Sequence, residues 1–141
     1  MKKFFVNAIL VPALAGALLA CSGSRTEAKQ LEGRWNVVEV KGEKIKAETT
    51  PFMEFDMKDK RLHGNAGCNI FNTSITLDSK DASSVKIEDG MTTMMDCPDM
   101  DIESKILQSM TDVRAVKAGS NPNEMLLVDA EGDVVMVLTR N

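Results

Sequence analysis

The chain has 141 residues, of which 43% are hydrophobic and 4% aromatic, and its formal net charge is −4. This length predicts one small domain with a modest core rather than two domains. An acidic chain has no electrostatic attraction for nucleic acid or for anionic lipid headgroups, so no nucleic acid partner is expected.

The first twenty residues predict a secretory signal peptide. Lys2 and Lys3 precede an apolar run over residues 4–20, and small residues lead to Cys21. The step Leu19-Ala20-Cys21 resembles the lipobox of bacterial lipoproteins. That resemblance implies cleavage before Cys21, a diacylglycerol on its sulfur and an acyl chain such as palmitate on the new amino end. The alternatives are an ordinary signal peptide with an incidental cysteine, or an uncleaved anchor.

Residues 21–30 are expected to form a lipidated polar tether, and residues 31–141 the domain. The formal charge becomes −6 once Lys2 and Lys3 are removed, so the membrane is held only through acyl chains, at about 0.8 kcal/mol per buried methylene. Ser22 stands where many lipoproteins retained in the inner membrane have aspartate. We therefore expect a monomer on the outer membrane, facing the periplasm, with an unidentified envelope protein as partner.

Extended segments and turns make up most of the remaining chain, because β-branched residues and apolar–polar alternation recur along it. The expected strands are residues 36–40, 53–57, 61–64, 68–77, 85–88, 113–117, 125–129 and 134–138. The last of these is a continuous apolar run, which predicts burial on both faces.

One helix interrupts the strands at about residues 99–112. Its expected first turn holds Asp99, Asp101 and Glu103, whose carboxylates suit the free N–H groups of a helix start. Ile102, Ile106, Leu107, Met110 and Val113 then share one face. Many strands, one helix and more strands predict an α+β domain. We expect a mostly antiparallel sheet, in a small curled or barrel-like meander, with the amphipathic helix packed on it.

The two cysteines that remain if Cys21 is lipidated are Cys68 and Cys97. In an oxidising compartment they are candidates for a disulfide, which would stabilise the fold by roughly 3–4 kcal/mol through its loop of about 30 residues. Two free buried thiols are the alternative. A nucleophilic pair of Cys68 with His63 is disfavoured, because no third group is evident to orient the histidine.

Two glycines, Gly64 and Gly67, bracket the segment before Cys68 and Asn69. Such a pair predicts a positive φ angle or a close backbone approach. No lysine and serine follow, so the segment is not a phosphate-binding P-loop.

Methionine is unusually frequent between Met91 and Met100. Thioethers are soft ligands that suit Cu(I), but methionine also fills core space, and we favour core filling because aromatic residues are scarce. Alternating acids from Asp129 to Asp133 are too short for an EF-hand and leave only weak calcium binding as an alternative. No pattern joins a nucleophile, a base and an oxyanion site, so we expect no catalytic residues, no resident metal and no cofactor.

Three segments, taken in order, resemble the META domain family, the HslJ-like proteins. They are Leu31-x-Gly33-x-Trp35, Gly64-x-x-Gly67-Cys68-Asn69 and Thr93-Met94-Met95-x-Cys97. The resemblance implies a small β-rich fold with a packed helix and brings with it no established catalytic residues. Family members are linked to heat shock, stress tolerance or antibiotic resistance. It also implies that Cys68 and Cys97 lie close together, and it makes Gly33, Trp35, Gly64, Gly67, Asn69, Thr93 and Met95 structural motif residues.

The segment Gly33-x-Trp35 also resembles the opening of a lipocalin, in which a barrel cavity holds an apolar ligand. The central position of the predicted helix disfavours that assignment. The favoured function is a non-catalytic, lipid-anchored envelope protein of the META domain type, related to stress or to the envelope. A carrier of a small apolar ligand and a soft-metal binder using the methionine and cysteine cluster are the alternatives.

Overall fold

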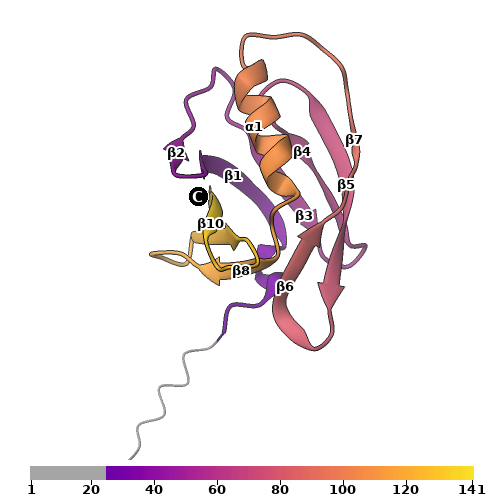
Figure 1. Ribbon diagram of the computed structural model, residues 1–141, viewed down its shortest axis with the longest axis vertical. Coiled ribbons are helices and arrows are strands. Elements are labelled where there is room, and N and C mark those ends of the chain that lie inside the picture. Colours follow the sequence, from indigo (N-terminus) through magenta and orange to yellow (C-terminus); the bar gives the residue numbers. More distant parts are fainter. Residues whose placement is uncertain (1–24) are drawn as a thin grey trace, which may run out of the picture.

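Residues 25–141 are described by the structure, a computed structural model (Figure 1). The expected signal peptide and Cys21 lie outside the described residues. The elements are η1 (Ala28–Leu31), β1 (Gly33–Val40), β2 (Glu43–Lys44), β3 (Phe52–Asp56), β4 (Arg61–Asn65), β5 (Ile70–Asp78), β6 (Asp81–Ile87), β7 (Met91–Thr92), α1 (Met100–Met110), β8 (Ala115–Ala118), β9 (Glu124–Val128) and β10 (Val134–Thr139).

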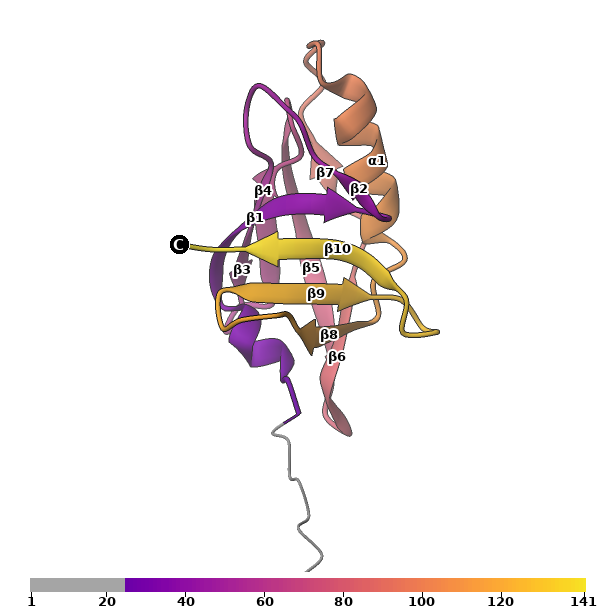
Figure 2. The same cartoon turned by 90° about the vertical axis from the view of Figure 1, so that its left-hand side faces the viewer.

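Eight of the strands form an antiparallel barrel in the order β10-β9-β8-β6-β5-β4-β3-β1, which closes where β1 pairs with β10. Closure leaves no free edge along the main sheet, because every strand of the ring has two neighbours. The expected barrel-like meander with one packed helix is therefore confirmed. Figure 1 shows α1 between β2 and β7, and Figure 2 shows the helix at one end of the barrel.

The opposite end of the barrel is closed around Trp35, which is fully buried. Its indole N–H donates to the carbonyl of Leu31 at 2.8 Å, and the guanidinium of Arg140 lies 4.1 Å from the ring centroid. Ala28 and Leu31 of η1 are buried in the same core. The folded domain thus begins inside the segment assigned to the tether, because the side chain of Ala28 joins the core.

Short elements account for most differences from the expected boundaries. Two strands were not among those expected: Glu43–Lys44 forms β2 against β1, and Met91–Thr92 forms β7 against β5. Both strands have two residues, too few for alternation to mark them. The helix ends at Met110, inside the expected range. In β10, Val135 to Leu138 are buried as expected, whereas Val134 is 44% exposed.

The start of α1 is held differently from the sequence-based expectation. Asp99 precedes the helix but makes no side-chain capping hydrogen bond. Its Oδ2 accepts the backbone N–H of Glu48 at 3.1 Å, so it fastens the β2–β3 connection instead. The capping role predicted for Asp99 is therefore wrong, because a donor from a distant segment takes its carboxylate.

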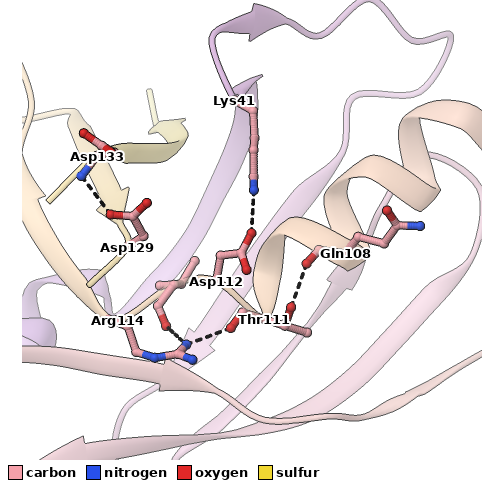
Figure 3. Close-up of polar contacts among 8 residues, drawn as sticks. Lys41, Gln108, Thr111, Asp112, Arg114, Asp129 and Asp133 are labelled. Atoms are coloured by element: carbon pink, nitrogen blue, oxygen red, sulfur yellow. Dashed lines mark hydrogen bonds and ion pairs between the residues drawn. The ribbon is translucent and has the colours of Figure 1, made fainter. Parts of the chain in front are cut away.

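The end of α1 is fastened to the barrel by polar contacts shown in Figure 3. The ammonium of Lys41, after β1, lies 2.5 Å from the carboxylate of Asp112. Arg114 donates to the carbonyl of Thr111 at 2.7 Å, which satisfies one of the free carbonyls at the end of the helix. Contacts at both ends of the helix thus hold it across the end of the barrel.

The acids from Asp129 to Asp133 form the β9–β10 turn (Figure 3). Asp129 Oδ1 accepts the backbone N–H groups of Glu131 at 3.0 Å and Asp133 at 2.9 Å. Asp129 thus serves as the local hydrogen-bond acceptor that such turns favour. No group of three or more histidine, cysteine, aspartate or glutamate side chains in residues 25–141 is placed to hold a metal ion.

The barrel interior is a packed hydrophobic core. Side chains from opposite walls, such as Met53, Phe55, Leu127 and Met136, belong to one buried cluster that α1 joins through Ile106. A lipocalin-like carrier needs this space for its ligand. The packing therefore disfavours the carrier alternative. Within residues 25–141, no helix has the length and apolarity needed to cross a membrane.

Replacing Trp35 with alanine is expected to lower the free energy of unfolding by about 3–5 kcal/mol, because a large cavity opens at the closed end of the core. Urea titration followed by circular dichroism measures the loss. The control is Val134→Ala, at a partly exposed site in β10, which should change stability by less than about 0.5 kcal/mol. A loss below about 1 kcal/mol for the Trp35 variant would contradict its central role.

Candidate functional site

Asn69 is the centre of a buried polar cluster at the α1 end of the barrel. Its side chain is 2% exposed, and its backbone N–H donates to Glu103 Oε1 at 2.5 Å. Its amide Nδ2 donates to Glu103 Oε2 at 2.7 Å and to the carbonyl of Met95 at 3.0 Å. The turn after β4 is thereby tied to α1 and to the segment before the helix.

The oxygen of the same amide completes the cluster. Asn69 Oδ1 accepts the hydroxyl of Thr93 at 2.8 Å and the backbone N–H of Met95 at 2.7 Å. An asparagine side chain offers two donors and one oxygen with two lone pairs, so all its hydrogen-bonding positions are occupied. We call Asn69, Thr93, Met95 and Glu103 the asparagine clamp. The predicted motif residue Asn69 is thus brought together with Thr93 and Met95, which lie 24 and 26 positions away in sequence.

The glycines before Asn69 let the chain reach this position. Gly67 has φ +130°, in the region that favours glycine. At Gly64 a Cβ atom would lie 2.0 Å from the carbonyl oxygen of Phe52, so no larger residue fits. Asn65 Oδ1 accepts the N–H of Gly67 at 2.7 Å and shapes the turn between them. Both expectations for the glycine pair, a positive φ and a close approach, are met, one at each glycine.

A disulfide joins Cys68 to Cys97 across 29 positions of sequence, with Cα atoms 6.1 Å apart. This separation lies within the range of protein disulfides. The pairing occupies the Cys68 thiol, so the alternative of a Cys68–His63 nucleophile is not formed. His63 instead faces Glu54 on the neighbouring strand, with Nε2 and Oε2 3.4 Å apart.

Residues 91–97, here called the methionine loop, run from β7 to the disulfide over the outside of the clamp. Met91 is 79% exposed, Met94 93% and Met95 61%. Core filling, the favoured interpretation of these methionines, is therefore wrong for all three. The clamp explains the outcome, because it binds the backbone of Met95 and leaves the side chains outside. One observation supports the soft-metal alternative, because Met94, Met95 and Met100 line the same hollow. Binding of a metal ion by these methionines stays a prediction.

Glu103 is the residue of the clamp whose predicted role, at the free N–H groups of the helix start, is wrong. It was expected to oppose the helix dipole at the surface, but it is 3% exposed and accepts two hydrogen bonds from Asn69. One signal could have found it. Glu103 lies three positions before Ile106 and seven before Met110, on the apolar face of α1. An acid on that face predicts a buried partner, because an unpaired buried carboxylate is costly.

The arrangement of polar groups in the clamp supports a structural role. The amide, hydroxyl and carboxylate groups of the clamp are directed at one another. Asp81, a carboxyl group outside the clamp, lies in the exposed hairpin between β5 and β6. The hydroxyl and then the backbone N–H of Ser83 donate to it and lower its pKa. These hydrogen bonds fix a turn and prepare no acid or base for catalysis.

Reduction of the disulfide is expected to lower the melting temperature by about 10 °C or more, because the opened loop of 29 residues regains roughly 3–4 kcal/mol of chain entropy. Thermal melts with and without dithiothreitol measure the difference. A Cys68→Ala/Cys97→Ala variant should melt low in both conditions. Equal melting temperatures for the untreated and reduced native chain would contradict the bridge.

Glu103→Gln is expected to lower the free energy of unfolding by about 1–3 kcal/mol, because its amide NH₂ faces one of the two N–H donors of Asn69 and leaves that buried donor unpaired. Glu131→Gln, the same change at an exposed turn, is the matched control. Urea titration by circular dichroism compares them. Equal stabilities for the two variants would show that the clamp contributes nothing measurable.

Comparison with known proteins places this architecture in a family. The family model of the META domain matches residues 26–141, and no curated protein matches the chain. The chain is similar in fold to the "NMR structure of the protein from Burkholderia xenovorans", with a TM-score of 0.60 and 19% identity over 80% of this chain and 85% of that one. The match spans the barrel, the asparagine clamp and the disulfide, and on this ground the chain belongs to the META domain family.

Proposed function

We propose that this protein is a non-catalytic, lipid-anchored monomer of the bacterial cell envelope. Acylated Cys21 holds the META domain on the outer membrane, facing the periplasm, in a role related to envelope stress. The observation that carries the proposal is the sequence of residues 1–21, in which lysines, an apolar run and a lipobox-like step lead to the cysteine. A signal of this kind delivers a domain to a compartment in which disulfides persist.

The shape of the domain supports a tethered arrangement. The described chain enters at one end of the long axis, through η1, and the methionine loop and the start of α1 lie at the other end (Figures 1 and 2). A lipid at Cys21 would hold the η1 end near the bilayer, because few residues separate Cys21 from Ala28. The end with the clamp would then face away from the membrane.

The clamp and the disulfide support a role without catalysis. An active site needs a nucleophile or a base that is free to meet a substrate. Here the Cys68 and Cys97 sulfurs are bonded to each other, and both carboxylate oxygens of Glu103 accept hydrogen bonds from Asn69. The asparagine clamp therefore holds segments together, as a scaffold for binding does.

Cys21→Ser is expected to abolish incorporation of radiolabelled palmitate and to move the protein from the membrane fraction to the periplasmic fraction. Ser22→Ala, the neighbouring change, should leave both properties intact. Mass spectrometry of the native protein should find an acylated amino end at Cys21. A native protein with an intact Met1 and no fatty acid would overturn the proposal.

A further inference from the structure

Two hollows adjoin on the outside of the domain and share the lining residues Thr92 and Leu107. One, of about 360 Å³, lies under the methionine loop, and the other, of about 300 Å³, lies between β5 and the end of α1. Together they form a groove between residues 88–96 and one face of the helix. Met100, Ser104, Leu107 and Thr111 line the helical wall, at the spacing of one helix face. From Met100 to Thr111 this wall spans about 17 Å.

The apolar side chains beside this groove are not explained by packing. Ile70, Met91, Met94 and Met95 are each more than half exposed, and Ile70 adjoins the loop through hydrogen bonds with Thr93. Burial of one such side chain stabilises a fold by about 1.5–3 kcal/mol, and none of the four contributes that here. Single exposed apolar residues are ordinary, but a contiguous group beside a groove is typical of an interaction surface.

The surface is also held in place before any partner arrives. The clamp binds the backbone of Met95, and the disulfide fixes Cys97 at the end of the loop. A surface that is ordered in advance loses less conformational entropy on binding. Methionine side chains on a fixed backbone still adapt to the shape of an apolar partner.

The negative charge of the groove favours a positively charged partner. Its lining includes Glu88, Asp89 and Asp96 and contains no lysine or arginine. Within residues 25–141, Asp89 and Asp96 belong to no ion pair, and the lysine of α1, Lys105, pairs with Glu43 on the other side of the helix. An apolar groove with unpaired carboxylates is complementary to a segment with alternating apolar and cationic side chains.

We propose that the groove between the methionine loop and α1 binds an extended cationic, amphipathic segment of a partner protein. Apolar side chains of that segment contact Met94, Met95 and Leu107, and its cations face Asp89 and Asp96. About five extended residues match the length of the groove. This site adds a class of partner to the proposed function. Its orientation away from the membrane rests on the proposed lipid anchor, whereas the binding itself does not. Anionic bilayers are disfavoured as the occupant by the same carboxylates.

The test uses the full chain with its native amino end in a zwitterionic bilayer disc, labelled at the methionine methyl groups. The probe is a blocked peptide of about six residues, alternating lysine and leucine. We expect NMR shifts at Met94, Met95 and Met100, with the buried Met53 and Met136 unchanged. Peptides with glutamate for lysine, or serine for leucine, should bind at least about tenfold more weakly.

Substitutions inside and outside the groove test where the peptide binds. Met94→Ser/Met95→Ser should weaken it by about tenfold, whereas Val134→Ser, at an exposed apolar site elsewhere, should leave it unchanged. Asp89→Asn/Asp96→Asn should weaken it and reduce its dependence on salt. No shifts, equal binding of the control peptides, equal loss with Val134→Ser, or shifts at Met53 and Met136 would each overturn the proposal. An unlipidated Cys21→Ser chain should bind the peptide equally, so failure of the anchor and failure of the groove are distinguished.

Discussion

The α1 end of this molecule depends on the burial of one amide, that of Asn69. A buried amide is costly unless each donor and acceptor is paired, so the arrangement that pairs them all is strongly preferred. Its partners come from α1, through Glu103, and from the methionine loop, through Thr93 and Met95. These segments have little backbone pairing with one another, and the clamp therefore supplies the order that strand pairing supplies elsewhere.

The barrel supplies the frame for this clamp. Closure of β1 on β10 removes the free edges of the sheet, and Trp35 and α1 occupy opposite ends of the core. Because the interior is packed with side chains, the binding site proposed above lies on the outside of the barrel. The feature that departs most from an ordinary surface, the exposed methionine loop, lies where the clamp and the disulfide act together.

The location inferred from the first residues and the chemistry of the domain are consistent with each other. A secreted domain can keep a disulfide, and Cys68–Cys97 reinforces the loop that the clamp already binds. The proposed lipid would hold this acidic domain at a membrane, and the proposed partner is cationic, as the carboxylates of the groove favour. The proposed anchor and the proposed groove thus act at opposite ends of one small barrel.

The strand-rich fold, the single α-helix and the candidate disulfide pair were predictable from the residues alone, because these features depend on local periodicity and on residue types. The burial of Val135 to Leu138 was predicted correctly from the apolar run, although Val134 is exposed, and Gly64 and Gly67 were predicted to need glycine. Periodicity could not reveal β2 and β7, which are too short, or the closure of β1 on β10. The burial of Glu103 and the exposure of Met94 follow instead from contacts between segments that are distant in the sequence. Both outcomes reverse the local preference of the residue, because the hydrogen bonds of Asn69, made across 24 to 34 positions of sequence, outweigh it.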